Sequence, residues 1–180
     1  HDMLLILDEI QSGMGRTGSM FAWQQYGVKP DVMTVAKALG NGVPVGAFLA
    51  SGKAASAMVP GDHGTTYGGN PLVTAAASAV LSIFEERGIV EHVNLVGGYL
   101  WEKLEELAAQ FDCITGHRGR GLMQGLEFQM PVGPIVQKAL LEEKLVLISA
   151  GSNIIRFVPP LIIEREHVDE MVRRLTAVLE

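Results

Sequence analysis

The sequence lacks several features that mark exported or membrane-spanning proteins. Its 180 residues contain one cysteine, Cys113, so no disulfide can form within the chain, and a reducing compartment is expected. No apolar run reaches the roughly 18 residues that a membrane-spanning helix needs. The N-terminal residues also lack the basic, apolar and small-residue order of a signal peptide. We therefore expect a cytoplasmic protein with no membrane partner.

Clustered positive charge is missing as well. The 14 Lys and Arg residues are outnumbered by 20 Asp and Glu residues, the formal net charge is −6, and the basic residues form no long run. Binding to a nucleic-acid backbone needs clustered Lys and Arg, so nucleic acid is not expected as a partner. Small molecules are the expected ligands.

The first half of the chain has the pattern of an α/β layer. Its short apolar runs are rich in branched residues, as in strands that are covered on both faces of a parallel sheet. A long Ala-rich helical pattern has a proline at its first turn and Gly88 just after its end. The predicted strands are 3–7, 32–35 and 43–50, and the predicted helices are 21–26 and 71–87. Together these elements favour parallel strands with helices packed against them.

The second half changes character and predicts an α+β unit. Amphipathic helical patterns alternate there with short strand-like runs. The predicted helices are 89–111, 134–144 and 164–180, and the predicted strands are 113–116, 121–128, 145–149 and 154–158. No linker rich in Ser or Pro separates the halves, so we place the domain boundary near Gly88, with domains at 1–88 and 89–180.

The stretch DEIQSGMGRTG, residues 8–18, contains the G-x-G-x-x-G pattern of dinucleotide-binding loops. In such proteins an acidic residue about 20 positions further on ends the next strand and binds the ribose. Here the next strand-like run, DVMTV, is followed by Ala36 and Lys37 instead. Asp8 and Glu9 also stand between the strand and the first glycine, where the loop should turn into its helix. A dinucleotide site is therefore disfavoured.

Asp8 and Lys37 are the strongest candidates for chemistry. Each stands at the carboxyl end of a predicted parallel strand, where open α/β sheets bind their ligands. Neighbouring strands lie about 4.8 Å apart, so the two side chains could contact opposite ends of one planar ring. Pyridoxal phosphate (PLP) has that shape, and it needs an amine for a Schiff base and a carboxylate to keep its ring nitrogen protonated. The alternatives are a turn-forming Asp and a solvated surface Lys.

Four sequence blocks strengthen the PLP interpretation. They are DEIQSGMGRTGSMFAW, PDVMTVAKALGNGVPVGAF, GDHGTTYGGNP and IIRFVPPLII, in this order. Their sequence and spacing resemble the signature blocks of the class III, or ornithine-type, PLP-dependent aminotransferases. The resemblance implies fold type I of the PLP-dependent transferases, the aspartate aminotransferase-like fold. Residues 1–88 would be the C-terminal part of the large PLP-binding domain with its parallel sheet, and residues 89–180 the C-terminal small domain.

The resemblance also implies which residues bind the cofactor. Lys37 would form the Schiff base, Asp8 would pair with the pyridinium nitrogen, and Gln11 would hydrogen-bond near the phenolic oxygen. Thr65 and Thr66 would hold the cofactor phosphate, with Thr66 reaching the neighbouring subunit of a homodimer whose active sites are shared. Helix capping by the two threonines is the alternative. No metal site is expected.

Arg156 lies inside an apolar strand pattern, where a cation is costly without an anionic partner. The resemblance implies that this partner is a carboxylate of the amino-acid substrate, which a guanidinium binds at two points. A structural ion pair with a Glu is the alternative. Arg16 and His63 are interpreted as structural residues, of the glycine-containing loop and of a turn respectively.

The reaction implied by the family is transamination of an omega-amino group to 2-oxoglutarate. The variants GNGVP and DHGTTYGGNP are most similar to the acetylornithine branch, which would place the protein in arginine biosynthesis. Ornithine, succinylornithine and 4-aminobutyrate stay open as amino donors. The chains of the family are much longer, so we expect that an N-terminal part of the enzyme is missing from this sequence. A non-catalytic folded module or dimerisation unit is the alternative from a different class.

Overall fold

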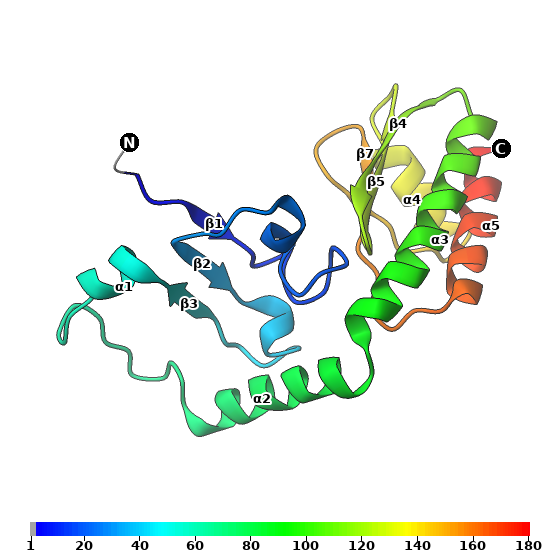
Figure 1. Cartoon of the computed structure of the whole chain (residues 1–180). Helices are drawn as coiled ribbons and strands as arrows, with labels where there is room; N and C mark the ends of the chain where they lie inside the picture. The colour runs from blue at the N-terminus through cyan, green and yellow to red at the C-terminus, as the bar shows by residue number, and fades with distance from the viewer. Residues whose placement is uncertain (1–2) are drawn as a thin grey trace. The chain divides into compact units, whose positions relative to one another are not determined.

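The computed structural model describes residues 3–180, which form two compact units (Figure 1). The first unit extends to Val90, and the second runs from Glu91 to Glu180. Each unit has a sheet of its own, and the two sheets differ in topology.

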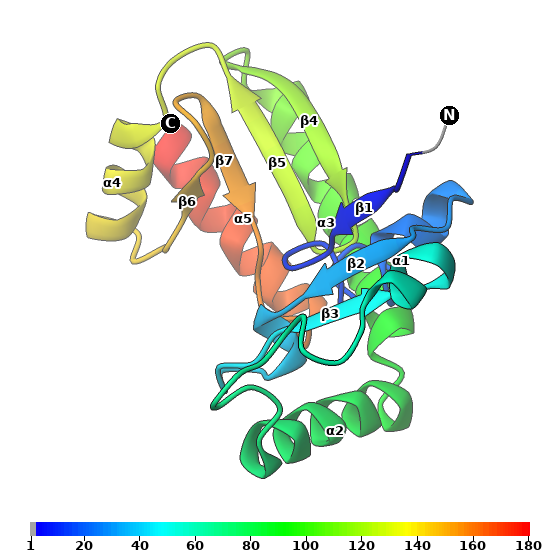
Figure 2. The same cartoon turned by 90° about the vertical axis from the view of Figure 1, so that its left-hand side faces the viewer.

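A three-stranded sheet organises the first unit, with β1 (Ile6–Asp8), β2 (Val32–Val35) and β3 (Ala47–Ala50) side by side in this order (Figure 2). β1 and β2 are parallel, and Asp8 is opposite Thr34. The central strand is the buried one, whereas β1 and β3 form the edges of the sheet. The buried side chains of β2 are Val32, Met33 and Val35.

The third strand contradicts the prediction of parallel strands throughout, because β3 runs antiparallel to β2. The connection between them, residues 36–46, contains a single 3-10 turn, η2 (Lys37–Leu39). A parallel partner needs a crossover of about a dozen or more residues that usually includes a helix, and this connection is too short for one. The edge strands are also not covered on both faces in this chain, since Ile6 is 61% and Phe48 is 56% exposed.

The first unit also contains helical segments. They are η1 (Ala22–Tyr26), η2, α1 (Gly52–Ala57) and α2 (Pro71–Glu86). Asn70 caps α2, because its side-chain oxygen accepts hydrogen bonds from the backbone N–H groups of Leu72 (3.1 Å) and Val73 (3.2 Å). The sequence predicted α2 to within one residue. It did not predict α1, because a run of six residues is too short to show a hydrophobic period.

The second unit contains a four-stranded antiparallel sheet in the order β4-β5-β7-β6. Its strands are β4 (Ile114–Arg120), β5 (Met123–Phe128), β6 (Ile148–Ser149) and β7 (Ile154–Phe157). Helices α3 (Ile89–Gln110) and α5 (Arg165–Leu179) lie side by side along one face of this sheet (Figures 1 and 2). A third helix, α4 (Gly133–Leu141), lies between β5 and β6 in the chain. The predicted α+β character of this half is confirmed.

The core of the second unit consists of apolar side chains that α3 and α5 place against the sheet. Those with almost no exposed surface include Leu100, Leu104 and Leu107 of α3, Leu126 and Phe128 of β5, Ile155 of β7, and Val168 and Leu175 of α5. Among residues 3–180, no helix is both long and apolar enough to cross a membrane.

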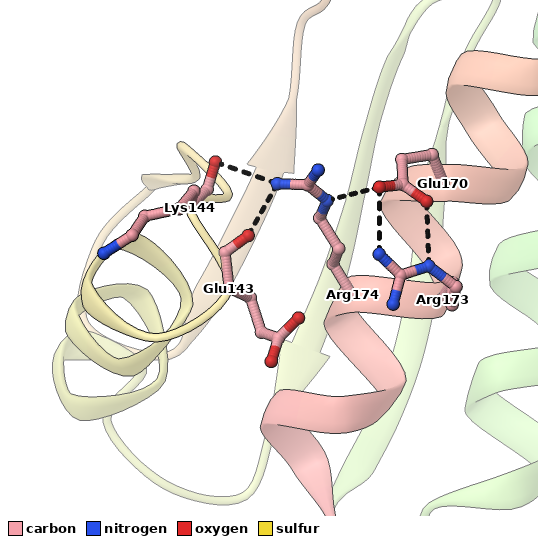
Figure 3. A network of polar contacts seen from close by, with 5 residues as sticks. All are labelled: Glu143, Lys144, Glu170, Arg173 and Arg174. Carbon is pink, nitrogen blue, oxygen red and sulfur yellow. Dashed lines mark hydrogen bonds and ion pairs between the residues drawn. The ribbon is translucent and has the colours of Figure 1, made fainter.

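A network of polar contacts joins α5 to the segment after α4 (Figure 3). Arg174 donates from Nη1 to the carbonyl oxygens of Glu143 (2.6 Å) and Lys144 (3.4 Å). Its Nε donates to the carboxylate of Glu170 (2.7 Å), which also accepts two hydrogen bonds from Arg173 (2.8 and 2.9 Å). Hydrogen bonds from Arg173 and then from Arg174 lower the pKa of Glu170 to about 2. Arg174 thereby holds the turn that leads out of α4.

Candidate active site

Asp8 is the last residue of β1 and is exposed. Its Oδ1 accepts hydrogen bonds from the backbone N–H of Ile10 (2.9 Å) and from Oγ1 of Thr34 on β2 (3.4 Å). The first bond closes a turn. The alternative role of Asp8 as a turn-forming residue therefore holds for Oδ1 but leaves Oδ2 unexplained. Within residues 3–180, no group donates to Oδ2, and this oxygen can accept a hydrogen bond from a ligand.

Lys37 is the first residue of η2 and follows β2 closely. Its φ of 45° lies in the left-handed region that residues other than glycine rarely adopt. The turn is held by hydrogen bonds from the N–H of Leu39 to the carbonyl of Ala36 (3.0 Å) and from the N–H of Gly40 to that of Lys37 (3.2 Å). Strained backbone of this kind is concentrated at functional sites. The residue is exposed and borders a hollow of about 410 Å³, which is otherwise lined by Ala38 and residues 41–45.

Because β1 and β2 are parallel, the carboxyl ends of both strands lie at the same end of the sheet. Asp8 and Lys37 therefore belong to one end of this sheet. A carboxylate and an amine on adjacent strands can bind two ends of a single ring. No cluster of three or more His, Cys, Asp or Glu side chains suited to a metal ion is found in residues 3–180.

Gln11 follows in the turn that leads from β1 to η1. The residues on either side of it are tethered, because the N–H of Ile10 donates to Asp8 and Oγ of Ser12 donates to Oε2 of Glu9 (2.6 Å). Gln11 itself is exposed. These tethers fix the backbone from which Gln11 extends, at the same end of the sheet as Asp8.

The glycines of the GMGRTG segment serve the packing of this loop. A Cβ atom on Gly13 would come within 2.7 Å of the carbonyl oxygen of Glu9. Gly15 has a φ of 76°, and a Cβ atom there would lie 2.7 Å from Cε1 of Phe84 on α2. Close contact within the first unit thus accounts for the G-x-G pattern without a dinucleotide. Arg16 is half-buried in the same loop, and desolvation lowers the pKa of its guanidinium.

Thr65 and Thr66 lie in an exposed loop ahead of α2, as does His63. Oγ1 of Thr65 accepts a hydrogen bond from the N–H of Gly68 (3.0 Å), which closes a short turn. Neither threonine caps the helix, because the capping side chain is that of Asn70. The capping alternative is therefore wrong for both residues.

Arg156 is the one predicted site residue that belongs to the second unit. It lies in β7, opposite Gly125 on β5 and Ile148 on β6. Arg156 is half-buried and borders a cavity of about 350 Å³ whose other walls are mostly apolar, among them Leu100 and Met171. A cation in such a setting is suited to an anionic ligand.

The family model of the class-III aminotransferases matches residues 1–179. The chain belongs to the class-III aminotransferase family. It is 48% identical over 171 residues to the acetylornithine aminotransferase of Clostridium acetobutylicum, covering 94% of this chain and 44% of that enzyme. It is 47% identical over 174 residues to acetylornithine aminotransferase 1 of Bradyrhizobium diazoefficiens, covering 96% of this chain and 43% of that enzyme. The chain thus spans less than half the length of these curated aminotransferases.

Solved transaminase structures have the same fold as this family member. The acetylornithine aminotransferase from Elizabethkingia anophelis matches with a TM-score of 0.90 and 34% identity, over 99% of this chain and 46% of that one. An S-selective transaminase from an Arthrobacter species, with alanine bound, matches with a TM-score of 0.93 and 30% identity, over 98% of this chain and 43% of that one. The predicted fold class, the aspartate aminotransferase-like fold type I, is confirmed.

Class-III aminotransferases depend on PLP. The solved ornithine aminotransferase from Toxoplasma gondii, with a TM-score of 0.91 and 31% identity to this chain, has PLP at its active site at partial occupancy. In this chain the exposed amine of Lys37 and the Oδ2 atom of Asp8 are the two kinds of group that the PLP ring requires. The residues at this end of the sheet therefore fit the cofactor of the family.

Glu9 is a buried residue next to the candidate site that sequence reasoning missed. It is 3% exposed, although its neighbour Asp8 is exposed. The sequence showed two adjacent acids before a glycine-containing loop, and nothing in it distinguished their environments. The local signal that could have found Glu9 is its spacing from Ser12, because side chains three residues apart can close a turn.

Proposed function

We propose that this aminotransferase uses N-acetylornithine as amino donor and transfers its omega-amino group to 2-oxoglutarate, with PLP as cofactor. The observation that carries the proposal is the pair of exposed groups, the Asp8 carboxylate and the Lys37 amine, at the same end of a parallel strand pair. The choice of donor is supported by the acetylornithine aminotransferases to which the chain is 43–48% identical. The protein would then be a cytoplasmic enzyme of arginine biosynthesis.

In this proposal Lys37 acts twice. Its amine would hold the cofactor, and once free it would move a proton from the substrate carbon that carries the amino group. When bound, PLP supplies a ring that accepts the electrons left on that carbon. Asp8 holds a proton at the ring nitrogen by a charge-assisted hydrogen bond. Gln11 hydrogen-bonds near the phenolic oxygen of the ring.

The other predicted residues bind the ends of the two ligands. Arg156 binds a substrate carboxylate by two parallel hydrogen bonds and so orients the substrate for proton removal. Thr65 and Thr66 bind the cofactor phosphate, with Thr66 acting in the site of the neighbouring subunit of a homodimer. The exposure of the Thr66 loop and the cavity beside Arg156 support these roles. Residues 1–88 would then belong to the large PLP-binding domain and residues 89–180 to the small domain.

Ornithine is the second candidate donor. The chain is similar to solved ornithine aminotransferases, such as that of Plasmodium yoelii, with a TM-score of 0.91 and 33% identity. Succinylornithine and 4-aminobutyrate are further candidate donors, because they differ from N-acetylornithine only in the groups distant from the reacting amine. All four donors therefore belong in the assay.

The test uses the complete gene product with PLP, 2-oxoglutarate and each donor in turn. We expect the highest kcat/KM with N-acetylornithine. Lys37→Ala should abolish transamination and the borohydride-trappable bond to the cofactor, while circular dichroism shows an unchanged fold. Lys53→Ala is the matched control, since Lys53 lies in α1, away from the sheet end that carries Asp8, and it should leave both readouts at the wild-type level. A Lys37→Ala protein that still traps cofactor would refute the assignment of the amine.

A further inference from the structure

Glu9 is one of two polar or charged side chains, with Gln124, that are buried among the described residues. A buried carboxylate is costly unless its oxygens are hydrogen-bonded. In residues 3–180 no Lys, Arg or His forms an ion pair with Glu9, so hydrogen bonds to neutral donors must stabilise it. Such a group needs a structural or functional explanation.

The explanation lies in four hydrogen bonds that Glu9 makes to separate segments. Its Oε2 accepts from Oγ of Ser12 (2.6 Å), and its Oε1 accepts from the backbone N–H of Trp23 in η1 (2.9 Å). Its carbonyl accepts from the N–H of Gly13 (3.0 Å), and its own N–H donates to the carbonyl of Thr34 on β2 (2.9 Å). Glu9 therefore ties the loop after β1 to both the central strand and η1.

This position has a direct consequence for the candidate site. Asp8 precedes Glu9, and Gln11 lies between Ile10, tethered to Asp8, and Ser12, tethered to Glu9. We propose that Glu9 is a positioning residue whose buried carboxylate fixes the directions of Asp8 and Gln11 toward the cofactor. This role rests on the proposed function, because it assumes that PLP binds at this site. All the hydrogen bonds of Glu9 that support it lie within the first unit.

The two donors to the carboxylate determine which substitutions are informative. Glu9→Ala leaves the N–H of Trp23 without its acceptor and releases Ser12. Glu9→Gln retains an oxygen for Trp23 and can donate its amide N–H to the Ser12 hydroxyl, which acts as donor or acceptor. Ser12→Ala removes one of the two side-chain contacts. A positioning role therefore predicts that loop order and PLP affinity are affected strongly by Glu9→Ala, weakly by Glu9→Gln and to an intermediate degree by Ser12→Ala.

The experiment compares these variants in the complete gene product, with and without added PLP. Without PLP, backbone amide exchange across residues 9–24 should rise at least about tenfold in Glu9→Ala and stay within about threefold of wild type in Glu9→Gln. With PLP, the dissociation constant measured from the visible absorbance should rise at least about tenfold in Glu9→Ala, and kcat should fall more than KM changes. Ser12→Ala should lie between wild type and Glu9→Ala in each measurement.

The matched control is Gln124→Leu, which removes the other buried polar side chain, in the second unit. It should lower the melting temperature without changing exchange across residues 9–24 or the dissociation constant of PLP. Wild-type exchange and PLP affinity in Glu9→Ala would overturn the inference, as would equal effects of Glu9→Ala and Gln124→Leu on PLP affinity. If Glu9→Ala fails to fold, Ser12→Ala decides: raised loop exchange supports the role, and wild-type exchange overturns it.

The proposed function fails in a distinguishable way. If wild-type protein does not transaminate any donor, or if Lys37→Ala still traps cofactor, the enzyme assignment is wrong whatever the Glu9 variants show. If the wild-type protein transaminates and Glu9→Ala matches it in exchange, affinity and kcat, only the positioning role is wrong.

Discussion

Asp8 uses its two carboxylate oxygens differently, since Oδ1 accepts from Ile10 and Thr34 and Oδ2 is left for a ligand. Asp8→Asn should fold normally, because an amide oxygen can accept the same two hydrogen bonds. Its kcat should fall on the order of 100-fold or more, because a neutral amide does not keep the ring nitrogen protonated. Steady-state kinetics and the absorbance of bound PLP measure the two effects separately. Near-normal turnover would show that another acid has this role.

Glu170 makes stability depend on acid pH. Its pKa in the folded protein is lowered to about 2, chiefly by the hydrogen bonds from Arg173 and then Arg174, from an ordinary value of 4.5. A lowered pKa means that the stabilisation is complete above about pH 4.5 and is lost as the pH falls toward 2. Urea midpoints of wild type and Glu170→Gln should therefore differ above pH 5 and converge near pH 2. Because the groups are exposed, added salt should reduce the difference, and a difference that persists at pH 2 would contradict this account.

Candidate site residues at the ends of apolar runs could be picked out from the sequence, and the buried polar residue beside them could not. Asp8 and Lys37 stand out in the sequence because a strand that ends in a charged residue needs only a local pattern to be recognised. The burial of Glu9 depends on η1, whose Trp23 lies 14 positions further along the chain. The positive φ of Lys37 is likewise a property of the folded turn, which the letters VAKALG do not reveal.

At the scale of elements, α3 approaches the strand pair β4–β5 closely through Gly97. A Cβ atom there would lie 2.6 Å from the carbonyl oxygen of Gly121, whereas a Cβ atom on the next residue, Gly98, meets nothing within 4 Å. Gly97→Ala should therefore destabilise the protein by about 1–3 kcal/mol, since backbone must move to relieve the overlap. Gly98→Ala should stabilise it by up to about 1 kcal/mol through helix propensity. Urea denaturation of both variants provides the comparison, and equal midpoints would contradict the close approach.

Elements whose ends are marked by capping or helix-terminating residues could be predicted from the sequence, and the direction of a strand could not. The limits of α2 follow from Asn70, Pro71 and the glycine after its end, all of which act within a few residues. The apolar run that became β3 was recognised, but its antiparallel direction depends on the length of the connection and on its partner strand. The apolar composition of the strands predicted that both faces of the sheet are covered. The exposure of Phe48 shows that an apolar strand does not guarantee a layer that covers it.

At the scale of the molecule, the described residues 3–180 leave much apolar surface uncovered. Tyr67 is 81% and Leu72 is 73% exposed, and β1 and β3 are edge strands. Residues 1–180 expressed alone should therefore self-associate or aggregate and show no measurable transaminase activity. Light scattering and a turnover assay with N-acetylornithine measure both outcomes. Phe48→Lys should reduce the association, because a charge on an edge strand opposes pairing. An active monomer would contradict this expectation and the placement of Thr66 in a shared site.

The left-handed backbone of Lys37 sets stability against the proposed activity at a single position. A lysine in this conformation costs roughly 1–2 kcal/mol that a glycine would not, yet a glycine has no amine. A substitution by glycine would therefore gain stability and lose the amine that we propose for the Schiff base in one step. Selection for thermostability alone would therefore favour replacement of this lysine, whereas selection that also demands turnover would retain it.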